Sequence, residues 1–243
     1  MVIDEARIAG LLDHRNIAKL IHADFEGRQL YQVMEFIRGV DLHTCLKLGP
    51  MPAALVTAIA QGVASGLHHA HARTDEKGNP LNIVHRDVTP QNVLVSRGGL
   101  VKLGDFGVAK AAQRQTKTRA GVIKGKLAYM SPEQIEQKDL DGRSDLFALG
   151  IVLFEVLTGQ HPFGYSHKGV VAILDERPED PRALRPDIPE ELARIIDKAL
   201  EKDRRLRFED ADAMRRDLEQ LLLDRAQIYG EREIAAFLRS LQA

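Results

Sequence analysis

The feature that most constrains this 243-residue chain is a β-hairpin predicted within residues 83–107. Two short runs rich in β-branched residues, 93–95 and 100–103, flank the segment Ser96-Arg97-Gly98-Gly99. Such runs favour strands, and glycine supplies the positive φ that a tight turn needs. The pattern therefore predicts that the chain folds back on itself here. Residues just before and just after the hairpin then meet at one end of a small ribbon.

Three oxygen-bearing side chains stand at the open end of this predicted hairpin. Asp87 and Asn92 precede its first strand, and Asp105 follows its second strand. Oxygen ligands with some negative charge suit Mg²⁺, an ion that usually keeps several waters and shares substrate phosphates. The sequence thus predicts a magnesium and phosphate site at this end of the hairpin.

The order of residues in this stretch resembles the catalytic loop of the protein kinase family. His85-Arg86-Asp87 is followed by Asn92 and then by Asp105-Phe106-Gly107. The resemblance implies that the γ-phosphate of ATP is transferred to a protein hydroxyl, with Asp87 accepting the proton and orienting the oxygen. It also implies that Asn92 and Asp105 hold Mg²⁺, while His85 and Phe106 pack beneath the site. Phosphoryl transfer needs positioning and neutralised charge more than covalent help, and these residue types supply both.

Composition is compatible with one large core or two lobes. The chain has a formal net charge of -1, 44% hydrophobic residues and 28% charged residues. This balance gives no reason to expect nucleic acid or an anionic membrane as the main partner. The lone cysteine, Cys45, excludes an internal disulfide and fits a reducing compartment. The longest apolar stretch, residues 146–157, is too short to span a bilayer, and no signal peptide is recognisable, so we expect a cytoplasmic protein.

Three elements are predicted before the hairpin. Residues 2–12 have the pattern of an amphipathic helix, and residues 17–25 and 30–36 have the pattern of strands. In the family these positions correspond to the end of the αC helix and to strands four and five, which lead into the hinge. By this resemblance the nucleotide site comprises the αC glutamate, the gatekeeper, the hinge, a ribose contact and a hairpin residue: Glu5, Met34, Glu35, Ile37, Asp41 and Leu94. Taken alone, Glu5 is better explained as a solvated helix residue, and it is the order of the motifs downstream that favours the αC glutamate.

The resemblance has a gap at its N-terminal side. No glycine-rich loop and no Val-Ala-Ile-Lys strand precede Glu5, although in the family these strands cover the nucleotide and the lysine pairs with the αC glutamate. Two explanations are open: Met1 is an internal methionine taken for a start, or the chain is a truncated kinase. We expect weak or absent nucleotide binding by the chain as written, and restoration if an upstream segment supplies these strands.

A long helix is predicted after Pro52, because apolar residues repeat every four positions from Leu55 to Leu67. The pattern ends in His68, His69 and His71, which raises the question of a metal site. No cysteine or carboxylate partner follows at ligand spacing, so packing and helix-end roles are favoured over zinc.

One departure from the family lies within the catalytic loop. Ser/Thr kinases usually carry lysine two residues after the catalytic aspartate, where this chain has Thr89. The family's Gly-Thr before the substrate-docking tyrosine reads instead Gly125-Lys126. We hypothesise that Lys126 reaches back toward Asp87 and supplies the missing positive charge, with Thr89 completing the hydrogen bonds. The alternative is that both changes are neutral drift.

Residues 108–130 correspond to the activation segment of the family. They are polar and basic, so they bury little apolar surface. Arg86 resembles the arginine that receives an activation-loop phosphate, and Thr116 and Thr118 are the available acceptors. The alternative is a solvated basic loop without a switch.

Three further positions resemble the substrate-docking scaffold of protein kinases. Ser131-Pro132-Glu133 matches the end of the activation segment, and Arg207 lies where the family keeps the partner of that glutamate. Asp145 begins the apolar run 146–157, where the resemblance implies that its carboxylate accepts hydrogen bonds from the catalytic-loop backbone. These positions disfavour a small-molecule kinase, which shares the hairpin but lacks this scaffold.

The predicted fold is α+β and protein kinase-like, with a mainly helical large lobe and a partial antiparallel strand lobe. Helical patterns continue over 189–200 and 209–223, and a last helix over 231–241 either docks on the lobe or binds a partner. We divide the chain into residues 1–36 as the remnant of the small lobe, 37–225 as the large lobe, and 226–243 as a C-terminal helix.

The function expected from these observations is a bacterial signalling kinase that uses ATP and Mg²⁺ to phosphorylate serine or threonine hydroxyls of a protein substrate. The loop 87–92 lacks the Ala-Ala-Arg pattern of tyrosine kinases. The second hypothesis is a non-catalytic, truncated kinase that binds protein partners through its helical lobe.

Overall fold

The predicted hairpin forms the centre of a three-stranded sheet. In the computed structural model, which describes residues 10–27, 29–106, 127–225 and 229–241, β4 (Val93–Ser96) pairs antiparallel with β5 (Val101–Leu103). β3 (Gly39–Asp41) pairs with the other edge of β4. Val93, Val95, Val101 and Leu103 are all buried. The alternation of side chains along each strand thus decides which face of the hairpin meets the core.

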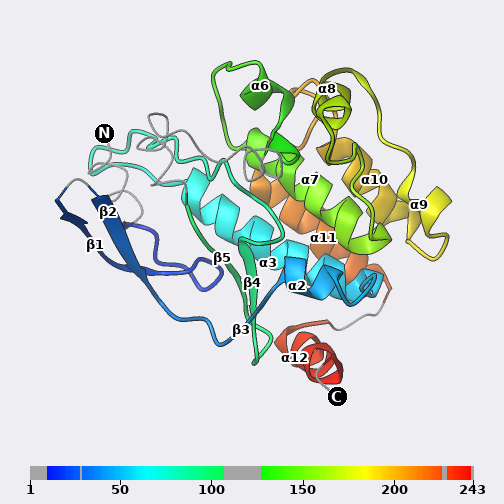
Figure 1. Ribbon diagram of the computed structural model, residues 1–243, viewed down its shortest axis with the longest axis horizontal. Coiled ribbons are helices and arrows are strands. Elements are labelled where there is room, and N and C mark those ends of the chain that lie inside the picture. Colours follow the sequence, from blue (N-terminus) through cyan, green and yellow to red (C-terminus); the bar gives the residue numbers. More distant parts are fainter. Residues whose placement is uncertain (1–9, 28, 107–126, 226–228, 242–243) are drawn as a thin grey trace.

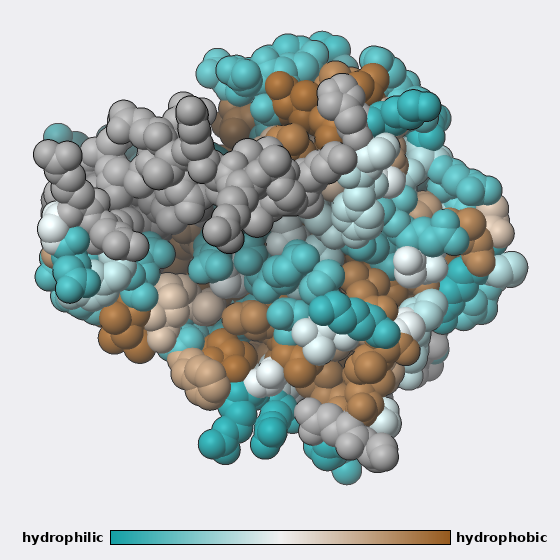
Figure 2. All heavy atoms as spheres, in the orientation of Figure 1, coloured by the Kyte–Doolittle hydropathy of each residue, from teal (hydrophilic) through white to brown (hydrophobic). Residues whose placement is uncertain are grey.

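A second antiparallel sheet lies to one side of the molecule (Figure 1). It consists of β1 (Leu20–Glu26) and β2 (Gln29–Met34), close to the predicted strands, whereas the helix predicted over 2–12 lies almost wholly outside the described residues. Ile17 connects the two sheets through a parallel bridge with Leu103. Figure 2 shows apolar surface at this side of the molecule. Several large hydrophobic or aromatic side chains on or near this ribbon are exposed: Ile21, Phe25, Tyr31, Val33 and Phe36.

The helical body is built around α7 (Arg143–Thr158), in which every residue from Ser144 to Leu157 is buried. A helix that is apolar on all sides has to be covered on all sides. α3 (Ala53–His71) and α10 (Glu190–Ala199) pack against α7, and α11 (Ala211–Asp224) packs against α3 (Figure 1). The long helices predicted from apolar periodicity are therefore confirmed.

Short helices complete the described part of the body, and apolar periodicity did not predict them. They are α2 (Leu42–Leu46), α6 (Pro132–Ile135), α8 (His167–Asp175) and α9 (Pro181–Leu184). Each begins after a residue whose side-chain oxygen accepts a hydrogen bond from a backbone N–H of the first turn: Asp41, Ser131, Ser166 and Asp180. Local capping defines these elements, because a helix of one or two turns is too short to show a reliable apolar stripe.

The last helix, α12 (Glu231–Ser240), docks on the helical body (Figure 1). Ile234 and Leu238 are buried in the same core cluster as residues of α3 and α7. Glu231 forms an ion pair with Arg15 and also lies against Gly99 in the β4–β5 turn. Docking was one of the two outcomes that the sequence left open, and partner binding through this helix stays a prediction.

Helices dominate the described residues, and the strands are confined to two small antiparallel sheets, which confirms the predicted α+β class. None of the helices in this part of the chain combines the length and the apolar character needed to cross a bilayer.

A buried ion pair joins α6 to the segment before α11, as the sequence predicted. Nη1 and Nη2 of Arg207 donate to Oε1 and Oε2 of Glu133 at 2.7 and 2.9 Å, and the Arg207 side chain is 0% exposed. Ser144 Oγ donates to Glu133 Oε1 at 2.6 Å. Burial alone would raise the pKa of Glu133, but the hydrogen bonds and charge of Arg207 lower it below its ordinary value.

Glu133→Gln is expected to lower the free energy of unfolding by about 3 kcal/mol at neutral pH, because it leaves the Arg207 charge buried without a carboxylate. The folded-state pKa of Glu133 is depressed, so its contribution is present above the unfolded value near 4.5 and is lost as pH falls toward the folded value. Urea unfolding of both proteins should show a difference that shrinks below about pH 4.5. A difference that stays constant into acid would contradict this role.

The ammonium nitrogen of Lys202 is buried and lies over aromatic rings. Its Nζ makes no hydrogen bond within the described residues, and it lies 4.0 Å from the centroid of the Phe163 ring and 5.5 Å from that of Phe147. Burial, with a contribution from Arg207, lowers the pKa of Lys202 to about 8. The lowered pKa means that the surroundings of this ammonium group disfavour its charged form.

Lys202→Met is expected to stabilise the protein, with a rise in Tm of about 2–4 °C near neutral pH. The pKa of Lys202 is about 8 in the folded state and 10.5 as its ordinary value. The charge of Lys202 therefore destabilises the folded state fully below about pH 8, and this destabilisation decreases as pH rises toward 10.5. Thermal unfolding at several pH values measures this gain, which should shrink in alkali. A lower Tm for the variant at neutral pH would show that the aromatic contacts outweigh desolvation.

Candidate active site

The catalytic-loop residues are held by one carboxylate at the start of α7. Asp145 Oδ2 accepts the backbone N–H of His85, and Oδ1 accepts the backbone N–H of Arg86, both at 2.8 Å. His71 Nε2, from the end of α3, lies 2.8 Å from Asp145 Oδ2. Burial alone would raise the pKa of Asp145, but His71 and the donating backbone of His85 lower it, so the carboxylate stays ionised. The predicted contact between Asp145 and the loop backbone is therefore present.

His85 connects the loop to the end of β5. Its Nδ1 accepts the backbone N–H of Asp87 at 3.2 Å, and its Nε2 lies 2.7 Å from the carbonyl oxygen of Gly104. Because a carbonyl only accepts, the ring carries its proton on Nε2. The imidazole is fully buried and meets the Phe106 ring edge-on, with centroids 4.5 Å apart. His85 and Phe106 thus pack beneath the loop.

Asn92 lies between the loop and the hairpin. Its Nδ2 donates to the Asp87 carbonyl oxygen at 2.7 Å, and the Gly104 N–H donates to the Asn92 carbonyl oxygen at 2.8 Å. The amide oxygen Oδ1 makes no hydrogen bond within the described residues, so it is the atom suited to ligate a cation. Asp105 follows Gly104 and has φ +51 with an exposed side chain. The hairpin thus brings Asp87, Asn92 and Asp105 to one end, and their roles as base and metal ligands stay predictions.

Arg86 adopts a backbone conformation that is unusual for a residue with a side chain. Its φ is +65, in the left-handed region. Such a conformation costs about 1–2 kcal/mol and persists only where surrounding contacts hold it. Thr89, two residues beyond Asp87, is buried, and its carbonyl oxygen accepts the Asn92 N–H at 3.0 Å. The loop is therefore fixed at both ends of the segment that carries Asp87.

The described residues assigned to the nucleotide lie on the two sheets or in the connection between them. Met34 lines a small cavity with Asp105 and Phe106. Glu35 Oε1 lies 2.5 Å from Lys102 Nζ and accepts the Lys19 N–H at 2.8 Å, so its side chain ties β2 to β5. Burial opposes ionisation of Glu35, but the hydrogen bond from Lys102 lowers its pKa.

The remaining nucleotide candidates lie on the three-stranded sheet and in the connection that leads to it. Leu94 is opposite Asp41 in the pairing of β3 with β4, and Asp41 Oδ1 accepts the Thr44 N–H at 2.6 Å as the cap of α2. Ile37 is half-buried in the connection between the two sheets. Contacts of these residues with a nucleotide stay predictions.

Several predicted residues lie outside the described residues. They are Glu5, Gly107, Thr116, Thr118 and Lys126. The hypotheses that Lys126 replaces the missing lysine and that a phosphothreonine binds Arg86 therefore stay predictions.

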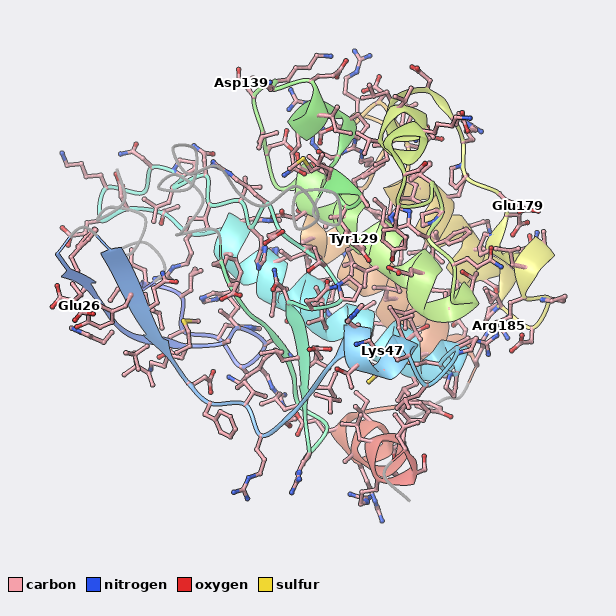
Figure 3. The ribbon with its side chains drawn as sticks, in the orientation of Figure 1. Glu26, Lys47, Tyr129, Asp139, Glu179 and Arg185 are labelled. Atoms are coloured by element: carbon pink, nitrogen blue, oxygen red, sulfur yellow. The ribbon has the colours of Figure 1, made fainter. Side chains whose placement is uncertain are left out.

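Two tyrosines cover the buried carboxylate of Glu155 in α7, and Figure 3 labels one of them, Tyr129. Tyr129 OH donates to Glu155 Oε2 at 2.6 Å, and Tyr165 OH donates to the other oxygen. Burial and then the Glu155 charge raise the pKa of Tyr129, so the phenol remains a donor. His161 lies against both rings, and burial lowers its pKa to about 4, so it is neutral at pH 7. This cluster fixes the segment that leads to Ser131-Pro132-Glu133.

Comparison with known proteins decides what this arrangement is. The family model described as the protein kinase domain matches residues 1–218. The chain belongs to the protein kinase family. The resemblance drawn from His85-Arg86-Asp87, Asn92 and Asp105-Phe106-Gly107 is thereby confirmed.

Bacterial kinases are among the named proteins that this chain is similar to. It is 41% identical to the tyrosine-protein kinase MasK of Myxococcus xanthus, over 98% of this chain and 38% of that protein. It is 36% identical to the serine/threonine-protein kinase PrkC of Bacillus subtilis, over 88% of this chain and 32% of that protein. The chain thus spans about a third of the length of each of these two relatives.

Solved kinase structures resemble this one closely enough to confirm the predicted fold. The kinase domain of PknI from Mycobacterium tuberculosis matches with a TM-score of 0.71 and 25% identity, over 90% of this chain and 77% of that chain. Rad53 in complex with AMP-PNP matches with a TM-score of 0.71 and 25% identity, over 88% of this chain and 53% of that chain.

Sequence reasoning missed three contacts of this site. It left His71 as a helix-end residue, whereas the ring binds Asp145, and it gave no partner to Glu35, which pairs with Lys102. It also passed over Gln134, which contacts the catalytic loop. The spacing of Ser131 and Gln134 is that of a capping box, and this signal was readable in the sequence.

Asp145→Asn is expected to loosen the catalytic loop, because one amide oxygen cannot accept from His85, Arg86 and His71 together. We expect the free energy of unfolding to fall by about 3 kcal/mol and the His85 and Arg86 amides to lose protection from hydrogen exchange. Asp139→Asn, at an exposed position, is the matched control and should change stability by less than about 0.5 kcal/mol. Equal protection in both variants would mean that Asp145 does not anchor the loop.

Proposed function

We propose that this protein is an ATP-dependent protein kinase that phosphorylates serine or threonine hydroxyls. The observation that carries the proposal is the Asp145-anchored loop, which holds Asp87 and Asn92 beside Asp105 at one end of the hairpin. Membership of the protein kinase family supports it. The bacterial relatives PrkC and PknL, both named serine/threonine-protein kinases, support phosphorylation of protein hydroxyls. A signalling role in the cytoplasm, where ATP is available, is part of the same proposal.

Asp87 is the residue that we assign to the substrate hydroxyl. Its backbone is held by His85 on one side and by Asn92 on the other, so its carboxylate is presented from a fixed segment. A carboxylate in this place accepts the hydroxyl proton and orients the attacking oxygen. We assign Arg86 to an activation-segment phosphate, and Thr89 with Lys126 to the charge beside Asp87.

Asn92 and Asp105 suit Mg²⁺, because this ion takes oxygen ligands. The Asn92 amide oxygen has no donor among the described residues, and the Asp105 carboxylate is exposed. Bound magnesium would neutralise charge on the phosphates. The complex of Rad53 with AMP-PNP supports ATP as the nucleotide. We place it against Met34, Glu35, Ile37, Asp41 and Leu94, with Glu5 nearby.

The proposal also specifies which amino acid of the substrate accepts the phosphate. PrkC and PknL carry serine/threonine-protein kinase in their names, whereas MasK is named a tyrosine-protein kinase. We favour serine and threonine, because the loop 87–92 lacks the Ala-Ala-Arg pattern of tyrosine kinases. Partial acid hydrolysis of the labelled product releases its phosphoamino acids, and electrophoresis then separates phosphoserine, phosphothreonine and phosphotyrosine. Label in phosphotyrosine alone would overturn this choice.

Asp87→Asn is expected to slow phosphate transfer from labelled ATP to a protein substrate by a factor of about 100 to 10,000, because the amide cannot accept the proton. Tm should change by less than about 2 °C, and Asp139→Asn should retain the full rate. An Asp87→Asn variant within about threefold of the parent would refute the role of Asp87. A folded parent protein that transfers no phosphate would refute the proposed activity and favour the non-catalytic interaction protein.

A further inference from the structure

We infer that Gln134 is a positioning residue for the catalytic loop, which it holds by the carbonyl group of the peptide that leads into Asp87. Gln134 is the third residue of α6. Its Nε2 donates to the Arg86 carbonyl oxygen at 3.2 Å, and its Oε1 accepts the Ser131 N–H at 3.0 Å. One side chain thus joins the start of α6 to the loop. This role rests on the proposed function of the loop.

The orientation of the Gln134 amide is settled by its two partners. A backbone N–H only donates, so the atom that faces Ser131 N is the oxygen. A carbonyl oxygen only accepts, so the atom that faces Arg86 O is the nitrogen. The two hydrogen bonds require the same orientation of the amide, and flipping the amide would break both of them.

The peptide between Arg86 and Asp87 is held at both of its polar groups. Gln134 donates to its carbonyl oxygen, and its N–H, which belongs to Asp87, donates to His85 Nδ1 at 3.2 Å. Since a peptide is planar, these two contacts fix its rotation about the chain. The rotation of this peptide sets the direction in which the Asp87 side chain leaves the backbone.

The contact also supports the strained conformation of Arg86. With φ +65, this residue needs restraint on both flanking peptides. Asp145 restrains the preceding N–H, and Gln134 restrains the following carbonyl. Helix α6, which carries Gln134, is itself fixed by the Glu133–Arg207 ion pair. A rigid connection therefore runs from the helical body through Gln134 to the loop.

The competing view is that Gln134 only caps α6, with the Arg86 contact incidental. Two variants at this position separate the roles, because each keeps one half of the amide. Gln134→Glu keeps an oxygen for the Ser131 N–H but turns a second oxygen toward the Arg86 carbonyl. Gln134→Lys keeps a donor for that carbonyl but loses the acceptor of the cap. Gln137→Glu and Gln137→Lys, at an exposed position just after α6, are the charge-matched controls.

The positioning role predicts opposite outcomes for the two variants. Gln134→Glu should keep its Tm within about 1 °C, exchange its Arg86 and Asp87 amide protons about fivefold to tenfold faster, and lose about fivefold to tenfold in kcat with an unchanged KM for ATP. Gln134→Lys should lose about 2–4 °C in Tm while its exchange rates and kcat stay within about twofold of the parent.

The inference is overturned if Gln134→Glu matches Gln137→Glu in amide exchange and kcat. It is also overturned if Gln134→Lys shows the same rise in amide exchange and the same loss of kcat as Gln134→Glu. Amide exchange does not depend on turnover. If the parent protein transfers no phosphate, the proposed function fails, and the exchange rates of the four variants still decide whether Gln134 holds the loop.

Discussion

The ionised carboxylate of Asp145 is the group on which the candidate site depends. It lies at the first turn of the most deeply buried helix and accepts two consecutive backbone N–H groups of the catalytic loop. A buried carboxylate needs donors, and a loop with a strained residue needs acceptors. Each requirement is met by the other, so the polar loop and the apolar helix stabilise one another. His71 completes the coordination of the carboxylate from a third element, α3.

The same principle recurs at the second buried carboxylate, Glu133. Arg207, Ser144 and surrounding carbonyl groups satisfy the charges of this pair. Buried ion pairs of this kind add little net stability over apolar residues of the same size, but breaking one is strongly destabilising. Together, Asp145 and Glu133 fix where the loop and α6 lie relative to the helical body. Lys202 shows the opposite case, since its buried ammonium group lies over aromatic rings and makes no hydrogen bond within the described residues.

Much of this architecture could be predicted from the sequence, for identifiable reasons. The hairpin was predictable because β-branched runs around a glycine turn leave few alternatives, and α3 and α7 because long apolar patterns have to be buried. The contacts of Asp145, Glu133 and Arg207 were predicted because these residues occupy positions that match the scaffold of the protein kinase family. The short helices were missed because their caps are local, and the partners of His71 and Glu35 because those contacts depend on how distant segments pack. The division into residues 1–36, 37–225 and 226–243 stays a prediction.

The turn of the catalytic hairpin has a consequence for how this protein can change over evolution. A Cβ at Gly99 would lie 1.8 Å from the carbonyl oxygen of Glu231, at the first residue of α12. Position 99 therefore accepts no side chain while α12 keeps its place, whatever its φ of +86 would otherwise permit. The β4–β5 turn and the first residue of α12 are therefore sterically coupled. We expect substitutions at position 99 to be accepted during evolution only together with a change in the position of α12.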